Sequence, residues 1–157
     1  MNKEDQVIMH FRDLFNKMVW LNKSKMEESL KGHTPSEVHC IEYIEKHADS
    51  NVTKLAEAFY MTRSAISKIT KKLIDKGLIE SYQKPDNLKE IYYRLTAQGK
   101  VIFNIHEELH SEFRERDKTV FEQVTDEQFD LMLTFMETYS RHLDAEIKKQ
   151  DADMQSE

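Results

Sequence analysis

Apolar residues recur at helical spacing towards both ends of the chain. Between about residues 4 and 30 they stand three or four positions apart, which predicts one long amphipathic helix ending near Gly32. A second long helix is predicted from Thr96 to about Val124, and a third opens at a capping box, Thr125-Asp126-Glu127-Gln128. The polar segment 151–157 is predicted to be a frayed tail. The inward faces of the three helices comprise Val7, Phe11, Leu14, Phe15, Met18 and Leu21, then Ile102, Ile105, Leu109 and Phe113, then Phe129, Met132, Phe135, Met136, Tyr139, Leu143 and Ile147.

Shorter helices are predicted in the middle of the chain. One begins at Thr34, because Thr is a good N-cap, Pro follows it, and Glu37 at the third helical position can bond back to the cap. A short helix over 53–59 follows, and after a turn Thr62 caps a helix over 63–76. The apolar positions of these helices are Val38, Ile41 and Ile44, then Leu55, Ala56 and Phe59, then Ile66, Ile69 and Leu73.

The hydrophobic period changes after the third of these helices. Residues 78–82 and 91–95 are β-branched or aromatic runs, separated by the polar segment 83–90, which predicts a β-hairpin with a long tip. Three helices followed by a hairpin, over residues 34–95, are the parts of a winged helix-turn-helix. The predicted fold is therefore mainly α with a small β-hairpin wing, and long helices flank this core on both sides.

Composition agrees with a mostly helical protein. The 157 residues suffice for one domain with helical extensions, and three Gly and two Pro are too few for a β-sandwich or barrel. A single Cys excludes an internal disulfide and a Cys-rich zinc finger. No segment approaches the roughly 18 apolar residues of a membrane span, and the first residues lack the basic and apolar regions of a signal peptide. We therefore expect a soluble, cytoplasmic protein with no membrane partner.

The net charge of −6 argues at first sight against nucleic-acid binding, but the charge is unevenly distributed. The helix over 63–76 carries five cations and one anion. Such a helix can enter the major groove and present donors to base edges and phosphates. A helical protein-interaction module without DNA binding is the alternative, but it would not need this basic helix. The candidate contacts to double-stranded DNA at this helix are Thr62, Arg63, Ser64, Ser67, Lys68, Lys71 and Lys72.

Several segments of the chain resemble MarR-family transcriptional regulators. The matching segments are Leu55-Ala56-Glu57, Met61-Thr62-Arg63-Ser64-Ala65-Ile66-Ser67, Leu73-Ile74-Asp75-Lys76-Gly77-Leu78-Ile79 and Leu95-Thr96-Ala97-Gln98-Gly99. The resemblance covers nearly the whole chain and implies a homodimer, each copy binding half of a pseudo-palindromic operator. We therefore expect a transcription repressor whose DNA affinity is modulated by a ligand.

The resemblance also implies how the chain is divided. Residues 1–150 form a single domain, in which 34–95 is the DNA-binding lobe. Residues 4–32 and 96–149 form the dimerisation helices, which intertwine with those of the second copy, and residues 151–157 are the tail.

The wing departs from the pattern that is common in this family. Members commonly carry an Asp and an Arg two residues apart, the Arg entering the minor groove, and the corresponding positions here are Asn87 and Lys89. Lys89 keeps the charge but loses the planar guanidinium. Lys84 is a second candidate for a wing contact. We expect wing contacts that are weaker or directed at phosphates.

A histidine pair suggests how DNA binding is controlled. His106 and His110 stand four residues apart, so both rings lie on one helix face, as in half of a metal site. With Glu28 and His39 they resemble the zinc ligands of the family's zinc-uptake repressors, which implies a zinc site with three nitrogen ligands and one oxygen ligand. A similar histidine pair occurs in members that resemble the fatty-acid-synthesis regulators. Zinc at these residues and an acyl or aromatic small-molecule effector are therefore both alternatives.

The sequence argues against zinc-protease activity and against a reactive thiol. Residues 106–110 resemble the His-Glu-x-x-His motif of zinc proteases, but no phosphate loop or nucleophile elbow accompanies them, so we expect no enzyme activity. Cys40 is flanked by Glu37, His39 and Glu42 rather than by the cationic setting of a reactive thiol. We expect it to be buried and inert.

Overall fold

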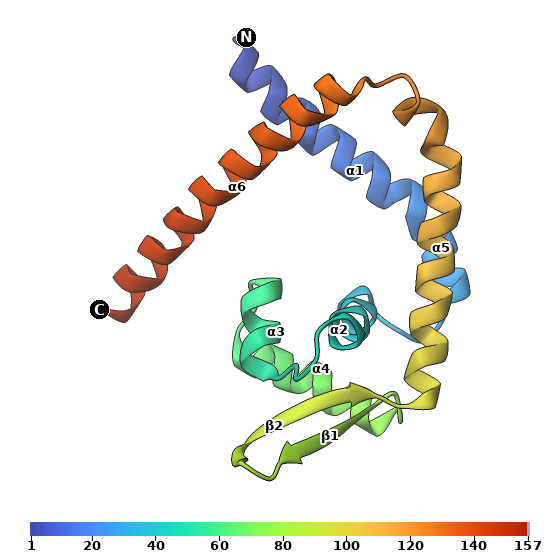
Figure 1. Ribbon diagram of the computed structural model, residues 1–157, viewed down its shortest axis with the longest axis vertical. Coiled ribbons are helices and arrows are strands. Elements are labelled where there is room, and N and C mark those ends of the chain that lie inside the picture. The colour runs from blue at the N-terminus through green and yellow to red at the C-terminus, as the bar shows by residue number, and fades with distance from the viewer. Residues whose placement is uncertain (157) are drawn as a thin grey trace. The chain divides into compact units, whose positions relative to one another are not determined.

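The computed structural model describes residues 1–156, which form six helices and one β-hairpin (Figure 1). The residues divide into two compact units, Met1–Phe113 and a second unit that begins at Arg114. The elements in chain order are α1 (Lys3–Ser29), α2 (Pro35–Lys46), α3 (Val52–Phe59), α4 (Arg63–Asp75), β1 (Ile79–Lys84), β2 (Asn87–Leu95), α5 (Ala97–Phe121) and α6 (Asp126–Gln155).

The N-caps predicted from the sequence are present. The side chains of Thr34, Thr62 and Thr125 each accept a hydrogen bond from the backbone N–H three residues later, and Thr125 forms a complete capping box with Gln128. The predicted box at Thr34 is wrong, because the Glu37 carboxylate turns inward and accepts a 2.6 Å hydrogen bond from Lys76 Nζ. A charge-assisted bond to a lysine thus replaces a bond to the backbone of the cap.

Two boundaries differ from the predictions. Only Pro85 and Asp86 separate β1 from β2, so the long tip predicted over 83–90 is wrong. The pairing continues past an irregularity between Tyr82 and Lys84, so that Lys84 pairs with Asn87. Polar residues can take part in it because backbone hydrogen bonds between strands do not require apolar side chains. Helix α6 runs to Gln155, so the frayed tail predicted from residue 151 is wrong up to that point, and residue 157 lies outside the described residues.

The hydrophobic core lies among α2, α3, α4, the hairpin and α5 as far as Phe113. Ile41, Leu55, Ile66 and Leu73 are completely buried in it, as the apolar spacing predicted. Phe59 and Ile69 are only half-buried and pack against its edge. Short helices and one hairpin thus form most of the core, and α4 packs against it with the face that carries Ile66 and Leu73.

Helices α1 and α6 contribute much less to any core. Helix α1 has no buried side chain, although Met26 near its end packs against the core and Leu30 just beyond it is buried. None of the described side chains of α6 is buried. Among residues 1–156, no helix combines the length and the hydropathy that a membrane span requires. The apolar stripes predicted on both helices are present. Most of their residues are exposed, and Phe11, Phe129, Tyr139 and Ile147 are half-buried.

Candidate DNA-binding surface and histidine cluster

Helices α3 and α4 are joined by a tight turn that leaves one face of α4 exposed. Tyr60 closes α3 in a left-handed conformation with φ 54°, and Met61 N–H donates to Ala56 O at 3.1 Å. Thr62 then caps α4. Because Ile66 and Leu73 are buried, the opposite face of α4 points to solvent.

The polar residues predicted on this face all lie at the surface. Thr62, Arg63, Ser64, Ser67, Lys68, Lys71 and Lys72 are exposed. Within residues 1–156, no ion pair involves Arg63, Lys68 or Lys71, whereas Lys72 Nζ lies 3.7 Å from Glu37 Oε1. Three cations of α4 are therefore not neutralised by the described part of the protein and are available to phosphates or base edges.

The other end of α4 is tied to the start of α2 through a buried carboxylate. Glu37 is 2% exposed, and Lys76 Nζ donates to it at 2.6 Å and to Gly32 O at 2.6 Å. His33 Nδ1 lies 3.7 Å from the same carboxylate. Burial alone would raise the pKa of Glu37, but the hydrogen bond and charge of Lys76, with Lys72 and His33, lower that pKa below its usual value. The carboxylate therefore stays charged and fixes the end of α4.

The three predicted wing residues have different surroundings. Lys89 is exposed and, among residues 1–156, forms no ion pair. Asn87 Oδ1 accepts hydrogen bonds from the backbone N–H groups of Lys89 and Glu90, both at 3.3 Å. Lys84 Nζ donates to Asp49 Oδ2 at 2.6 Å. Lys89 thus has the most accessible charge of the three, and Lys84 is already paired inside the protein.

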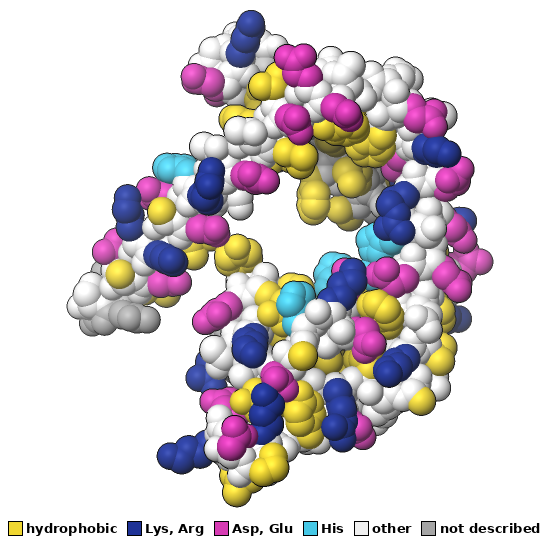
Figure 2. Space-filling view, in the orientation of Figure 1, with side chains coloured by type: hydrophobic (Ala, Val, Ile, Leu, Met, Phe, Trp, Pro, Cys, Tyr) yellow, Lys and Arg dark blue, Asp and Glu magenta, His cyan; other side chains and the backbone are white. Residues whose placement is uncertain are grey.

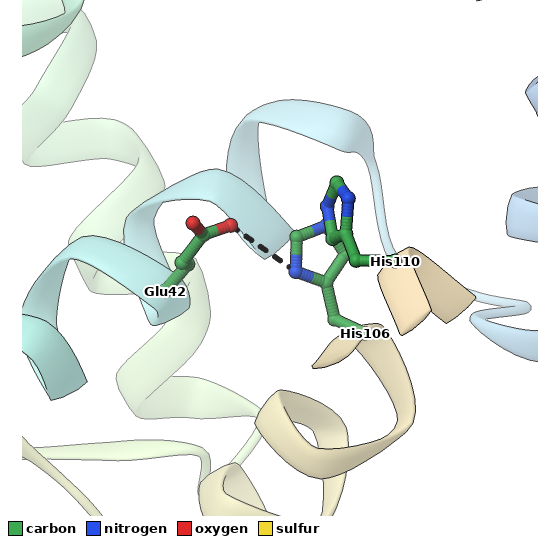
Figure 3. A group of neighbouring side chains, drawn as sticks. All are labelled: Glu42, His106 and His110. Carbon is green, nitrogen blue, oxygen red and sulfur yellow. Dashed lines mark hydrogen bonds and ion pairs between the residues drawn. The ribbon is translucent and has the colours of Figure 1, made fainter. Parts of the chain in front are cut away.

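A second group of polar side chains lies between α2 and α5. His106 and His110 come from α5, and their Nε2 atoms lie 3.0 Å apart. Glu42 comes from α2, and its Oε2 lies 3.1 Å from His106 Nδ1 (Figure 3). Figure 2 shows histidine side chains gathered over α2 and α5 on the face in view. Possible ligand atoms of Glu42, His106 and His110 all lie within 4.8 Å of one another, close enough to hold one metal ion.

The surroundings of His106 favour its neutral imidazole. His106 is 1% exposed, and its burial, followed by the nearby His110, lowers the pKa of the ring. Burial would raise the pKa of Glu42, but the hydrogen bond from Lys46 and the charge of His106 lower it overall. Nδ1 of His106 has no aligned hydrogen-bond partner, although Glu42 lies at ion-pair distance. A neutral imidazole beside a carboxylate is the form that ligates metals.

The structure brings together half of the predicted metal ligands. His106 and His110 are adjacent, as their spacing predicted, but Glu28 is exposed near the end of α1 and lies outside the group. His39 is also exposed and outside it, with its ring centroid 6.3 Å from that of His106. Glu42 was missed in the sequence. The sequence does hold a signal for Glu42, because it stands three residues after His39 and so lies on the same face of α2.

Cys40 lies apart from this chemistry. Its side chain is buried, and burial raises the pKa of the thiol to about 11, with a further contribution from the charge of Glu37. The thiol is therefore protonated at neutral pH, in agreement with the expectation of a buried residue. A protonated thiol is a poor nucleophile.

A helix-turn-helix with an exposed basic second helix, followed by a hairpin, defines a winged-helix DNA-binding protein. The model of the MarR family matches residues 33–91. The chain is 29% identical over 148 residues to the HTH-type transcriptional regulator PchR of Bacillus subtilis (strain 168), covering 85% of this chain and 88% of that protein.

Solved structures show the same fold. FabT of Streptococcus pneumoniae in complex with DNA is 18% identical, with a TM-score of 0.77 over 91% of this chain and 99% of that one. A variant of MepR from S. aureus bound to an oligodeoxyribonucleotide is 21% identical, with a TM-score of 0.56 over 85% of this chain and 97% of that one. The chain belongs to the MarR family of DNA-binding transcription regulators.

Proposed function

We propose that this protein is a repressor that binds a pseudo-palindromic operator as a homodimer, with α4 of each copy in a major groove. The observation that carries the proposal is the exposed face of α4, where Arg63, Lys68 and Lys71 have no ion pair among residues 1–156. These cations stand beside Ser64 and Ser67, whose hydroxyls can hydrogen-bond to base edges or phosphates. The exposed Lys89 adds a wing contact.

The dimer is supported by the uncovered apolar stripes of α1 and α6, each taken separately. On α1 the exposed apolar residues include Leu14, Phe15, Met18, Val19, Trp20 and Leu21. On α6 they include Leu131, Met132, Leu133, Phe135, Met136 and Leu143. A second copy of the chain supplies a self-complementary surface for such stripes. It also supplies the second α4 that a palindromic site requires.

The DNA-binding proposal is tested with a charge reversal on α4. Lys68→Glu/Lys71→Glu and the wild type are titrated onto DNA from upstream of the protein's own gene, with fluorescence anisotropy as the readout. We expect the variant to lose at least about 100-fold in affinity, because phosphate contacts become repulsive. Lys3→Glu/Lys148→Glu is the matched control, since it changes the net charge equally at two exposed sites outside the lobe. Equal losses in both variants would contradict a role for α4 and favour an interaction module.

A second proposal concerns the effector, which we infer to be zinc bound at the histidine cluster. The Nε2 atoms of His106 and His110 face each other, and Glu42 lies at the opposite nitrogen of His106. Glu42 lies on the side from which a carboxylate orients a ligating imidazole, and a small rotation of the ring would align Nδ1–H with it. His106 and His110 of α5 would hold the ion, and Glu42 of α2 would orient His106. The bound ion would make His106 Nδ1–H a stronger donor and so would strengthen the contact between α5 and α2. Stabilising one dimer geometry in this way would change the operator affinity.

Zinc is tested against the alternative effectors in the same anisotropy assay. The wild type is titrated in chelator and then with added zinc, and native mass spectrometry counts bound ions. We expect zinc to tighten operator binding about tenfold, equivalent to about 1.4 kcal/mol of coupling. His106→Ala should abolish both effects, whereas His10→Ala, at an exposed position on α1, should retain both. Specific DNA binding that is indifferent to zinc would contradict the proposal and leave acyl or aromatic small molecules as the candidates.

A further inference from the structure

The loop between α2 and α3 carries an acidic residue that is bonded to the wing. Tyr82 Oη donates a hydrogen bond to Asp49 Oδ1 at 2.7 Å, and Lys84 Nζ donates to Asp49 Oδ2 at 2.6 Å. Both donors belong to β1. The two oxygens of one carboxylate therefore bind two side chains of one wing strand.

The residues that follow Asp49 extend this attachment to β2. Tyr93 N–H donates to Ser50 O at 2.9 Å, so this loop forms an isolated β-bridge with the strand. Asn51 Nδ2 lies 3.5 Å from Glu90 Oε2. Successive residues of the loop thus contact both strands of the hairpin, and Asp49 supplies the contacts to β1.

The backbone at Asp49 adopts a left-handed conformation. Its φ of 59° lies in the left-handed region, which Asp and Asn tolerate better than most residues. Lys54 Nζ donates to the Asp49 carbonyl at 3.0 Å and holds the loop from the α3 side. The carboxylate is therefore presented to the wing from a loop that is bonded on both sides.

The charge of Asp49 is unexpected next to a DNA-binding element. A carboxylate there repels phosphates, and its pairing with Lys84 removes one cation from the wing. Lys84 Nζ also lies 5.0 Å from the centroid of the Tyr92 ring, a cation–π contact that retains it near the protein. The geometry of these groups favours anchoring the wing over contacting DNA.

We propose that Asp49 is a positioning residue for operator binding, which fixes the wing to the helix-turn-helix through Tyr82 and Lys84. Lys84 is then an anchor of the wing, and Lys89 is the wing's phosphate contact. This inference rests on the proposed operator binding. It predicts that removing the negative charge at residue 49 weakens DNA binding. Electrostatics alone would predict stronger binding, because the carboxylate repels phosphates.

Two substitutions of Asp49 separate its bonds. Asp49→Asn keeps an acceptor for Tyr82 and tolerates the left-handed backbone, but it loses the ion pair to Lys84. Asp49→Gly keeps the backbone conformation and loses both bonds. Asp75→Asn is the matched control, because it removes one exposed negative charge on α4 without touching the wing.

The free protein is examined first, by hydrogen exchange of the hairpin amides in residues 79–95. We expect exchange there to accelerate at least tenfold in Asp49→Gly and less in Asp49→Asn, with the amides of α2 and α4 unchanged. Unchanged hairpin exchange in Asp49→Gly would overturn the anchoring role without reference to DNA.

Operator binding is then measured by anisotropy at several salt concentrations. We expect about a fivefold loss of affinity for Asp49→Asn and about a twentyfold loss for Asp49→Gly, whereas Asp75→Asn binds as tightly as the wild type or more tightly. The slope of log affinity against log salt concentration (the salt slope) reports the number of phosphate contacts. Lys89→Met should reduce the magnitude of this slope by about one, and Lys84→Met should leave it unchanged. Asp49→Asn/Lys84→Met should bind no worse than Asp49→Asn alone, because both substitutions break the same pair.

The possible failures are distinguishable. If Asp49→Asn binds operator like Asp75→Asn, or if Lys84→Met lowers the salt slope by about one, the positioning role is overturned and operator binding stands. If the wild type itself shows no specific binding, the proposed function is overturned and the positioning role with it.

Discussion

The lobe and the arms of this protein differ in where their apolar surface is buried. We define the lobe as α2 to β2 and the arms as α1 and α6. In the lobe, Leu55 and Ile66 are completely buried against residues of the same chain. In the arms, Phe15 on α1 is 65% exposed, and no described side chain of α6 is buried. The same helical spacing of apolar residues thus forms an internal core in one region and an uncovered surface in the other.

The comparison teaches that an amphipathic stripe predicts burial but does not say against which chain. The lobe has α2, α3, α4 and a hairpin to enclose one core, so its stripes meet each other. Each arm is one long helix, and most of the apolar residues in its stripe are exposed. Exposed apolar surface on this scale is typical of an interface. The lobe should therefore respond to mutation through folding, and the arms through association.

The largest effect is expected from a charge placed on the α1 stripe. Phe15→Asp should weaken the dimer about a thousandfold, or about 4 kcal/mol, because a two-fold interface contains the substitution twice. Analytical ultracentrifugation measures the dissociation constant. Lys17→Asp is the control, since Lys17 pairs with Asp13 on the opposite face of the same helix. A dimer that tolerates Phe15→Asp would remove α1 from the interface.

A core truncation in the lobe should act on folding instead. Leu55→Ala removes a completely buried side chain and should lower the free energy of unfolding by about 3 kcal/mol. Leu88→Ala, on the exposed wing, should change it by less than about 0.5 kcal/mol. Urea unfolding of both variants measures the difference. Similar values for the two would show that the lobe lacks an independent core.

The buried Glu37 should make the stability of the lobe sensitive to acid. Because its folded pKa is below the usual value of about 4.3, its stabilising effect is complete above that pH and is lost as pH falls through the folded pKa. Glu37→Gln should therefore cost about 2 kcal/mol at pH 7 and progressively less at lower pH.

Urea unfolding between pH 3 and pH 7 measures this dependence. The exposed Glu57→Gln provides the baseline, since Glu57 lies on the surface of α3. A constant difference between Glu37→Gln and the wild type across this range would contradict a charged, paired Glu37.

The smallest effect is expected at the turn before α4. Tyr60 has φ 54°, a conformation that costs an L-residue other than Gly about 1 kcal/mol. Tyr60→Gly should therefore raise the melting temperature of the lobe, whereas Glu57→Gly within α3 should lower it by a similar amount. Calorimetry of the two variants checks the opposite signs. Destabilisation by Tyr60→Gly would mean that contacts of the tyrosine side chain outweigh the strain.

Local elements of the fold and one face of the site could be predicted from the sequence. Thr62 and the apolar stripe of α4 are signals within a few residues, and both are confirmed. The adjacency of His106 and His110 likewise follows from their spacing. The wing tip was missed because strand pairing stabilises polar residues that carry no hydrophobic alternation.

The sequence by itself determined the helices, their caps and the basic face of α4, because these depend on residues within one or two helical turns. Only the tertiary structure decided which distant charges meet. Glu37 bonds Lys76, 39 positions away, and Asp49 bonds Lys84, 35 positions away. Glu42 joins the histidine pair across two helices. Such pairs depend on how separate elements pack, and no local period encodes the relative placement of two elements.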